Sequence, residues 1–240
     1  LAAVPPVLET RGLKKGYRRR QRKITAVEQV SFCLYPGEIL GLMGPSGSGK
    51  STVAKLLAGL AEADEGEIFL DGKKISCRKR EQRKEIYRKM QMVFQSPAAS
   101  FDPRRTLGDG IGESLRNAGI SGKTLDERVK ELLRSCGLSE EFVRRYPHEV
   151  SGGQCQRAAI ARALAVNPKI LICDEATSAL DVMAQRQILE LLASLRETRG
   201  ISILFICHNP AVVEAFCDRF LVMEQGRVIR EEAIPTAAVP

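Results

Sequence analysis

The sequence predicts an α/β fold in which an all-helical segment interrupts a series of alternating strands and helices. Short apolar runs alternate with segments of helical spacing along most of the 240 residues. A glycine-rich loop at residues 44–51 separates one such run from a helix, the arrangement of a phosphate-binding turn. No buried strand is apparent between residues 96 and 149. We therefore expect one α/β core with a helical insertion.

The N-terminal elements are expected to form a hairpin. Residues 7–13 are typical of a short strand, and the apolar alternation of residues 24–34 predicts a second strand paired with it. Residues 38–43 form a third strand that leads into the glycine-rich loop, and residues 50–60 have helical spacing.

The remaining elements follow from the same patterns. Further strands are predicted at residues 66–70, 90–94, 170–173, 201–206, 220–223 and 227–230. Helical pieces such as residues 124–136 occupy the strand-free stretch, and residues 233–240 are expected to be a loose tail.

Composition excludes several classes of protein. Hydrophobic residues make up 44% and charged residues 28%, values of a folded globular chain rather than of a disordered or low-complexity one. No stretch approaches the ~18 apolar residues of a membrane span, and the N-terminus has no leader pattern. The missing initiator Met suggests a trimmed start. We expect the chain not to cross a membrane by itself.

Neither the cysteines nor the net charge of +8 predicts a specific site: the cysteines do not indicate a metal site, and the charge does not indicate a nucleic-acid partner. Seven scattered cysteines without a CxxC motif indicate reduced, mostly buried thiols and a cytosolic protein rather than a metal site. The basic runs at residues 18–23 and 78–84 could bind nucleic acid or an anionic membrane face, although a solvated surface is the usual explanation. Because no aromatic residues are interleaved for base stacking, nucleic acid is not expected as a partner.

Residues 44–51, Gly-Pro-Ser-Gly-Ser-Gly-Lys-Ser, match the pattern G-x-x-x-x-G-K-[ST] between a predicted strand and a predicted helix. Glycines let backbone N–H groups approach a phosphate chain at the helix N-terminus. Lys50 would neutralise the β- and γ-phosphate oxygens, and the Ser51 hydroxyl could bind Mg²⁺. The sequence therefore predicts a nucleoside triphosphate site in a P-loop NTPase core.

Two adjacent acids end the apolar strand at residues 170–173. Asp174 and Glu175 could be a helix-capping pair. Beside a P-loop, however, two different roles in phosphoryl transfer explain them better. We expect Asp174 to hold Mg²⁺ and Glu175 to polarise the attacking water.

Residues 151–154, Ser-Gly-Gly-Gln, open a helix at residues 155–164 and form a second helix N-terminus that can receive an anion. A chain with one P-loop does not need two such sites for one nucleotide, so a partner's ligand is expected there. With both phosphate-site motifs and this segment in order, the sequence resembles the ATP-binding-cassette (ABC) ATPases over about residues 7–232. Their signature, usually Leu-Ser-Gly-Gly-Gln, is present with Val150 in the first place.

The resemblance implies further site residues. Gln95 resembles the Q-loop glutamine, with a role in catalysis and at the metal; Asp181 belongs to a segment like the D-loop; His208 resembles the switch histidine. Tyr17 stands where the family places an adenine-stacking aromatic. Nucleotide contacts are implied at Gly44, Ser46, Gly47, Gly49, Lys50, Ser51, Thr52, Ser151, Gly153 and Gln154.

Three positions depart from the family pattern, namely Cys155, Cys207 and Asn209, and none removes a phosphate contact. The resemblance also implies a RecA-like core with an antiparallel β subdomain. Residues 1–95 and 155–232 would form the ATPase core, residues 96–154 a helical subdomain ending in the signature, and residues 233–240 the tail.

Residues 95–104, 146–149 and 178–185 are similar to the oligopeptide, dipeptide and nickel importer ATPases. This likeness implies an ATP-driven motor at the cytoplasmic face of the membrane, acting on peptides or nickel and metal chelates. Its partners would be a second ATPase subunit, homologous but non-identical, two permeases and an external substrate-binding protein. Residues 96–105 would open the surface that docks a permease. An exporter ATPase or a soluble ABC ATPase is the alternative. An ATP-dependent kinase would need an acceptor site, which no segment suggests, and the sequence does not name the solute.

Overall fold

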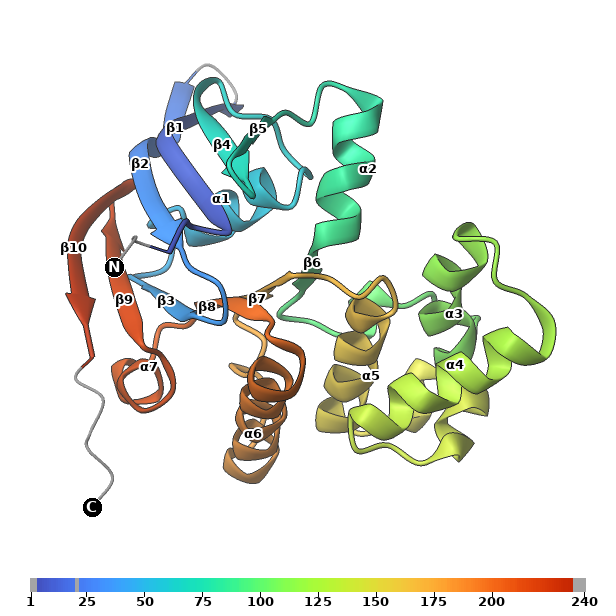
Figure 1. Cartoon of the computed structure of the whole chain (residues 1–240). Coiled ribbons are helices and arrows are strands. Elements are labelled where there is room, and N and C mark those ends of the chain that lie inside the picture. The colour runs from blue at the N-terminus through green and yellow to red at the C-terminus, as the bar shows by residue number, and fades with distance from the viewer. Residues whose placement is uncertain (1–3, 20–21, 235–240) are drawn as a thin grey trace.

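The structure is a computed structural model that describes residues 4–19 and 22–234. It contains two β-sheets with α1 between them and a group of helices on the far side of the larger sheet (Figure 1). In the described ranges, no helix is long and apolar enough to cross a bilayer.

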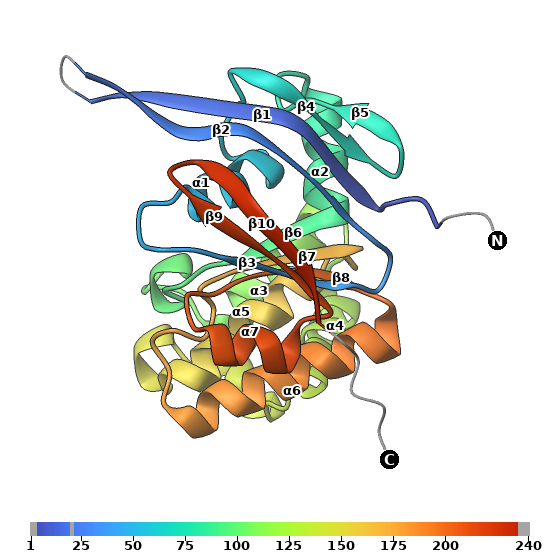
Figure 2. The same ribbon diagram turned by 90° about the vertical axis from the view of Figure 1, so that its left-hand side faces the viewer.

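The smaller sheet is antiparallel and has the strand order β2-β1-β4-β5. Its strands are β1 (Leu8–Arg19), β2 (Arg22–Leu34), β4 (Glu65–Leu70) and β5 (Lys73–Ile75). The expected hairpin is confirmed, but β1 runs well beyond residue 13 because its outer half stays paired with β2, up to Arg19 opposite Arg22. The described part of the first basic run therefore continues these two strands, as Figure 2 shows for their long projecting ribbon.

The larger sheet has the order β10-β9-β3-β8-β7-β6, with neighbouring strands parallel from β9 to β6 and only β10 antiparallel. Its strands are β3 (Ile39–Met43), β6 (Met90–Val93), β7 (Ile170–Asp174), β8 (Ser202–Ile206), β9 (Arg219–Glu224) and β10 (Arg227–Ala233). All six were predicted. The last strand includes Ala233, the first residue of the expected tail; residues 235–240 of that tail lie outside the described residues.

The three central strands are buried along their whole length, which explains their continuous apolar sequences. Side chains alternate between the sheet's two faces, so that Ile170 and Ile172 join the cluster below the small sheet while Leu171 and Cys173 join the cluster under the helices. Two hydrophobic cores thus hold the large sheet rigidly between them.

Helices lie on both faces of the larger sheet, and most of them lie on the face away from the smaller sheet (Figure 1). Helix α1 (Lys50–Leu57) lies between the sheets, and α2 (Arg80–Lys89) leads into β6. The segment between β6 and β7 is entirely helical, as predicted: α3 (Leu107–Asn117), α4 (Gly122–Ser135) and α5 (Gly152–Leu164), with short 3-10 turns at Ala98–Ser100, Glu140–Arg144 and Pro147–Glu149. Helices α6 (Val182–Arg199) and α7 (Pro210–Phe216) complete the fold. The exact division at residues 96 and 154 stays a prediction.

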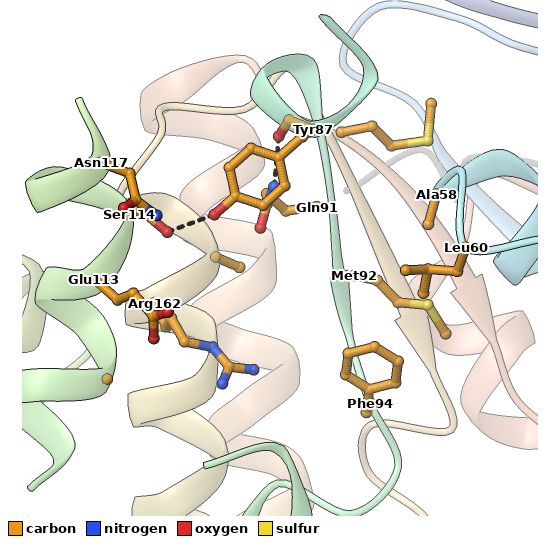
Figure 3. Close-up of a pocket in the computed structure, with 13 residues that line it drawn as sticks. Ala58, Leu60, Tyr87, Gln91, Met92, Phe94, Glu113, Ser114, Asn117 and Arg162 are labelled. Atoms are coloured by element: carbon orange, nitrogen blue, oxygen red, sulfur yellow. Dashed lines mark hydrogen bonds between the residues drawn. The ribbon is translucent and has the colours of Figure 1, made fainter. Parts of the chain in front are cut away.

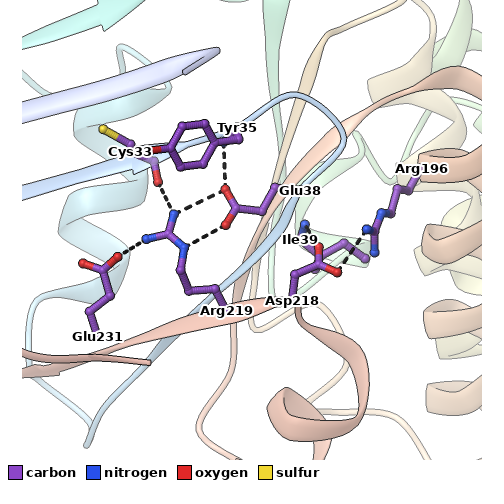
Figure 4. A network of polar contacts seen from close by, with 8 residues as sticks. All are labelled: Cys33, Tyr35, Glu38, Ile39, Arg196, Asp218, Arg219 and Glu231. Carbon is purple, nitrogen blue, oxygen red and sulfur yellow. Dashed lines mark hydrogen bonds and ion pairs between the residues drawn. The ribbon is translucent and has the colours of Figure 1, made fainter. Parts of the chain in front are cut away.

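A polar network joins the two sheets near the start of β3 (Figure 4). The guanidinium of Arg219 donates to the Glu38 carboxylate at 2.8 Å and to the Cys33 carbonyl at 2.7 Å, and it also pairs with Glu231. Burial lowers the pKa of Arg219, but the hydrogen bonds and charges of Glu38 and Glu231 outweigh it, and the pKa is raised. The network therefore keeps its charge and ties β2 to β9.

All seven cysteines are free thiols, five of them buried. Burial raises the pKa of Cys136 and of Cys173 to about 12, so both are protonated at neutral pH. They behave as small apolar side chains, which agrees with the interpretation of the sequence.

Candidate functional site

The glycine-rich loop lies at the carboxyl end of β3 and is packed closely against two other strands. A Cβ at Gly44 (φ 149°) would lie 2.1 Å from the Met223 carbonyl oxygen, and one at Gly49 (φ 108°) would lie 2.2 Å from the Ala26 carbonyl oxygen. Only glycine permits these approaches. Gly47, also left-handed, has open space instead, which leaves its backbone accessible to a ligand.

Helix α1 begins at Lys50 with no side chain capping its first turn, because Gly49 is the N-cap residue. Its first N–H groups therefore remain available to an anion. The Lys50 side chain is only 5% exposed, and its ammonium donates to the carbonyl oxygens of Gly44 at 2.8 Å and Pro45 at 2.9 Å. The loop itself thus holds this charge at the base of the turn.

A cavity of about 330 Å³ lies over the loop, and the residues that line it come from four separate parts of the chain. They are Ala26, Ser46, Gly47, Gly49, Lys50, Ser51, Thr52, Gln95 and Glu175. A second hollow of about 660 Å³ shares Ser51 and Gln95 with the first and adds Asp174, Lys55 and Arg162. The structure therefore gathers the predicted P-loop, Gln95 and both acids at one place.

The Ser51 hydroxyl donates to the Asp174 carboxylate at 3.0 Å, joining α1 to the end of β7. Burial and the neighbouring Glu175 charge raise the pKa of Asp174, against the lowering effect of Ser51, Lys55 and Lys50. A bound cation stabilises the ionised form of such a buried carboxylate. Hydroxyl and carboxylate oxygens suit Mg²⁺, which completes its shell with phosphate oxygens and water, so the donor set fits this ion.

Glu175 is held in an uncommon conformation, with φ at 49°. Its N–H donates to the Ile206 carbonyl at 3.0 Å, and its carboxylate accepts a hydrogen bond from the Gln95 amide at 2.9 Å. The same amide lies 3.4 Å from the Ser178 hydroxyl. Left-handed non-glycine residues gather at functional sites, and here the conformation aims the carboxylate into the cavity lined by the P-loop.

The remaining predicted residues do not line these two cavities. Ser151 caps α5, accepting from the Gln154 N–H at 3.3 Å while the Gln154 side chain accepts from the Ser151 N–H at 3.0 Å. Asp181 caps α6 by accepting from the Ala184 N–H at 2.9 Å. Gly153 packs beside α6, where a Cβ would lie 3.1 Å from that of Ala184. The signature segment thus presents an exposed, preformed helix start away from this chain's own P-loop.

Tyr17 and His208 also stand apart from the cavities. Tyr17 lies on β1 opposite Ile24, is 41% exposed and has the Lys15 ammonium 5.7 Å from its ring centre. His208 is exposed, directly after β8. Their roles toward a nucleotide stay predictions.

Sequence reasoning gave no role to several residues at the site. Ala26 forms part of the cavity wall because β2 passes over the loop, and nothing in its local sequence marks this. Arg162, one of two arginines on α5, lies over the Phe101 ring at 4.6 Å and donates to the Ser100 carbonyl. Its position between Ala161 and Ala163, in the apolar half of the helix, was the signal that the sequence offered.

Comparisons with known proteins agree with this arrangement. The profile of the family described as ABC transporter matches residues 27–178. The oligopeptide transport ATP-binding protein OppF of Haemophilus influenzae is 46% identical over 218 residues, which cover 90% of this chain and 66% of OppF. The glutathione import ATP-binding protein GsiA of Escherichia coli is 47% identical over 232 residues, covering 93% of this chain and 37% of GsiA.

The chain therefore spans about two thirds or less of the length of these relatives. Among solved structures, the dimeric ATP-binding cassette MJ0796 in a post-hydrolysis state with ADP and Pi has a TM-score of 0.86 at 33% identity, covering 95% of this chain and 98% of that one. CbiO1 of Clostridium perfringens, part of the transporter complex CbiONQ, has a TM-score of 0.83 at 28% identity, covering 95% and 88%.

Proposed function

Because this chain belongs to the ABC transporter family, we propose that it is the ATP-hydrolysing subunit of an importer and that its site binds ATP with Mg²⁺. The observation that carries the proposal is the meeting of Lys50, Ser51, Gln95 and Glu175 around one cavity, beside the buried Asp174. These groups are what phosphoryl transfer to water requires: phosphate neutralisation, metal ligands and an activated nucleophile.

Each residue has a defined task in this proposal. Lys50 and the free N–H groups at the start of α1 bind the β- and γ-phosphates. Mg²⁺, held by Ser51 and Asp174, would neutralise charge on the phosphates. Glu175 accepts the proton of the attacking water, and Gln95 holds that carboxylate in place through its amide.

The signature segment supports a dimeric mechanism. Ser151, Gly153 and Gln154 form an exposed helix start that does not face the chain's own cavity, and it is suited to the γ-phosphate of ATP bound to a second ATPase subunit. Asp181 lies at the neighbouring helix start and would belong to the same interface. His208 would contact the γ-phosphate, and Tyr17 would stack on adenine.

Peptides are the substrate class that we propose, because OppF and GsiA are named for oligopeptide transport and glutathione import. Nickel or metal-chelate import, which the sequence also suggested, receives no support from these names and stays an alternative. An external binding protein would deliver the solute, and the chain would act at the cytoplasmic face of the membrane.

A groove beside the site suits the permease. It has a volume of about 300 Å³ and lies between α2, β6, α3 and α5, with Leu60, Met92 and Phe94 on one wall and Glu113 and Ser114 on the other (Figure 3). Phe94 and Arg162 line both this groove and the hollow next to Asp174. A segment seated in the groove would therefore touch the residue directly before Gln95.

Residues 96–105, the predicted docking segment, lie next to this wall. Ser96, Ala99 and Ser100 line the hollow that the groove adjoins. Cysteines introduced at Ala99 and, as a control, at Ser121, directly before α4, can be tested for crosslinking to the permease. Crosslinks from Ala99 only are expected; crosslinks from Ser121 only would place the docking surface elsewhere.

The activity itself is tested with the purified chain. Phosphate release from ATP should require Mg²⁺ and should fall by ~10² to 10⁴ in Glu175→Gln, which keeps the size of the side chain but cannot accept the proton. Glu197→Gln, on the exposed end of α6, serves as the matched control. Release by Glu175→Gln at the native rate would reject the assigned role of this carboxylate.

A further inference from the structure

Helix α2 carries a row of basic side chains that the ATP site does not use. Arg80, Arg83, Lys84, Tyr87 and Arg88 are spaced i, i+3, i+4, i+7 and i+8, so they share one face of the helix. All five are exposed, Tyr87 to 48%. We name these five residues the basic face of α2.

The opposite face of α2 is attached to the protein, which fixes the direction of the basic face. Ile86 is buried, and the Gln82 side chain accepts from the Ser76 N–H at 3.0 Å. The Lys89 ammonium donates to Asp71 at 2.9 Å and to Glu85 at 2.8 Å. The helix therefore cannot turn its cations toward internal carboxylates.

The charges of the basic face are largely uncompensated. Within the part of the chain that the structure describes, Arg80, Arg83 and Arg88 form no ion pair, and Lys84 has only Glu81, 3.9 Å away. Arg80 also lies in the first turn of α2, where the helix dipole favours acids rather than bases. Neither helix formation nor internal pairing explains this concentration of cations.

The basic face borders the groove that we propose for the permease. Tyr87 belongs to it and also lines the groove that we propose for the permease, where its hydroxyl lies 2.6 Å from the Ser114 hydroxyl (Figure 3). A membrane subunit seated in that groove would contact Tyr87, so α2 would lie on the side of the chain that faces the membrane subunit. In Figure 1, α2 stands at one end of the molecule, between the small sheet and α3, and not within the core.

We infer that the basic face of α2 binds the anionic lipid headgroups of the inner leaflet. This inference rests on the proposed function for the location of the groove. The inner leaflet carries anionic lipids that attract clusters of Lys and Arg. The cytoplasmic loops of membrane proteins instead carry an excess of Lys and Arg, so a permease surface would on average repel these residues. The charge of the face therefore favours lipid over permease.

Co-sedimentation of the whole chain with vesicles tests the inference. Vesicles of phosphatidylcholine with 30% phosphatidylglycerol (about one lipid in three, enough to give a negative surface) should bind the chain, and pure phosphatidylcholine should not. The double variant Arg83→Gln/Lys84→Gln should bind about 30-fold more weakly, since each cation near the surface contributes about fivefold. High salt should weaken binding by the native chain.

A matched control removes the same charge elsewhere. Arg186→Gln/Arg199→Gln changes two exposed arginines on α6, which lies on the other side of the large sheet from α2. Native-like vesicle binding by this control, with loss in the α2 variant, supports the inference. Equal binding by both variants, no binding of the native chain to anionic vesicles, or tighter binding to a single-stranded oligonucleotide than to the vesicles would overturn it.

ATP titration separates this result from the proposed function. Arg83 and Lys84 lie outside the cavities at the P-loop, so the α2 variant should bind ATP as the native chain does. A native chain that fails to bind ATP would reject the proposed function whatever its behaviour with vesicles.

Discussion

The Gln95 amide donates a hydrogen bond to the Glu175 carboxylate at 2.9 Å, across 80 residues of sequence. Gln95 follows β6 and Glu175 follows β7, and these strands are parallel neighbours, so their carboxyl ends meet at one edge of the sheet. The bond links the proposed general base to the strand that forms a wall of the groove in Figure 3. In the proposed function, this bond is the direct connection between a partner in that groove and the Glu175 carboxylate.

Gln95→Ala should reduce turnover while leaving ATP affinity nearly unchanged. A hydrogen bond to a charged group contributes about 1.5 to 3 kcal/mol, which corresponds to a loss of about 10- to 150-fold in rate if the bond orients Glu175 for proton transfer. Steady-state phosphate release and a nucleotide titration measure the two quantities separately.

Gln91→Ala is the matched control for that prediction. Gln91 lies on β6 too, but its side chain bonds to the Tyr87 carbonyl and does not line the cavity at the P-loop. Native turnover in Gln95→Ala would show that the bond is not needed to position Glu175.

Lys50→Ala should weaken ATP binding by about 100-fold, as expected for the loss of ~3 kcal/mol of charge-assisted hydrogen bonding to phosphate. The fold should persist, because the loop is also held by Gly226 N–H donating to the Ser48 carbonyl at 2.9 Å. Titration with a fluorescent ATP analogue, with thermal melting as a check, measures both. Lys123→Ala, at an exposed position of α4, should behave as the native chain; equal affinity in Lys50→Ala would contradict the P-loop assignment.

Glu175→Gln with ATP and Mg²⁺ should shift the chain to a dimer in size-exclusion chromatography, alone or with a cognate ATPase subunit. Slowed hydrolysis keeps the nucleotide between two subunits, and the exposed helix start at Ser151 would cover the partner's γ-phosphate. Adding Ser151→Arg should abolish the shift by blocking that site.

Ser121→Arg is the control for the second substitution, because Ser121 is likewise an exposed serine at the N-cap position of a helix, α4. Unlike Ser151, its side chain makes no capping hydrogen bond. It should leave the dimer intact. A trapped variant that binds ATP but stays monomeric with every candidate partner would argue against a shared site.

Gln156→Leu should stabilise the chain. Gln156 on α5 is 0% exposed, and within the described structure neither its amide nitrogen nor its amide oxygen has a hydrogen-bond partner. An unsatisfied buried polar group costs about 1 to 3 kcal/mol, and an apolar side chain of similar size removes that cost. A gain of ~1 kcal/mol corresponds to about 2 to 4 °C in Tm for a chain of this length. A lower Tm in calorimetry would mean that the amide is bonded in solution.

Contiguous motifs could be identified from the sequence because local geometry determines them. The P-loop needs a strand, glycines that permit close approach and a helix start, and all three lie within residues 39–57. The apolar runs of the central strands were equally clear, since burial on both faces leaves no polar position. The strand-free stretch correctly predicted the helical segment before α5.

Other elements escaped prediction for physical reasons. Helix α2 has one buried residue, Ile86, so it lacks the apolar periodicity by which a helix is recognised. Strand β5 has three residues and exists through its pairing with β4. The outer half of β1 is stabilised by β2 across the hairpin rather than by its own composition.

The sequence by itself determined which residues form the candidate motifs, because each motif is a short segment whose backbone and side chains interact with one another. Only the tertiary structure decided which of them work together. The Ser51 bond to Asp174 and the Gln95 bond to Glu175 join segments 123 and 80 residues apart, and the sheet order brings them to the same edge. The same packing directed the signature helix start and the basic face of α2 outward, because both are attached to the core from their opposite sides.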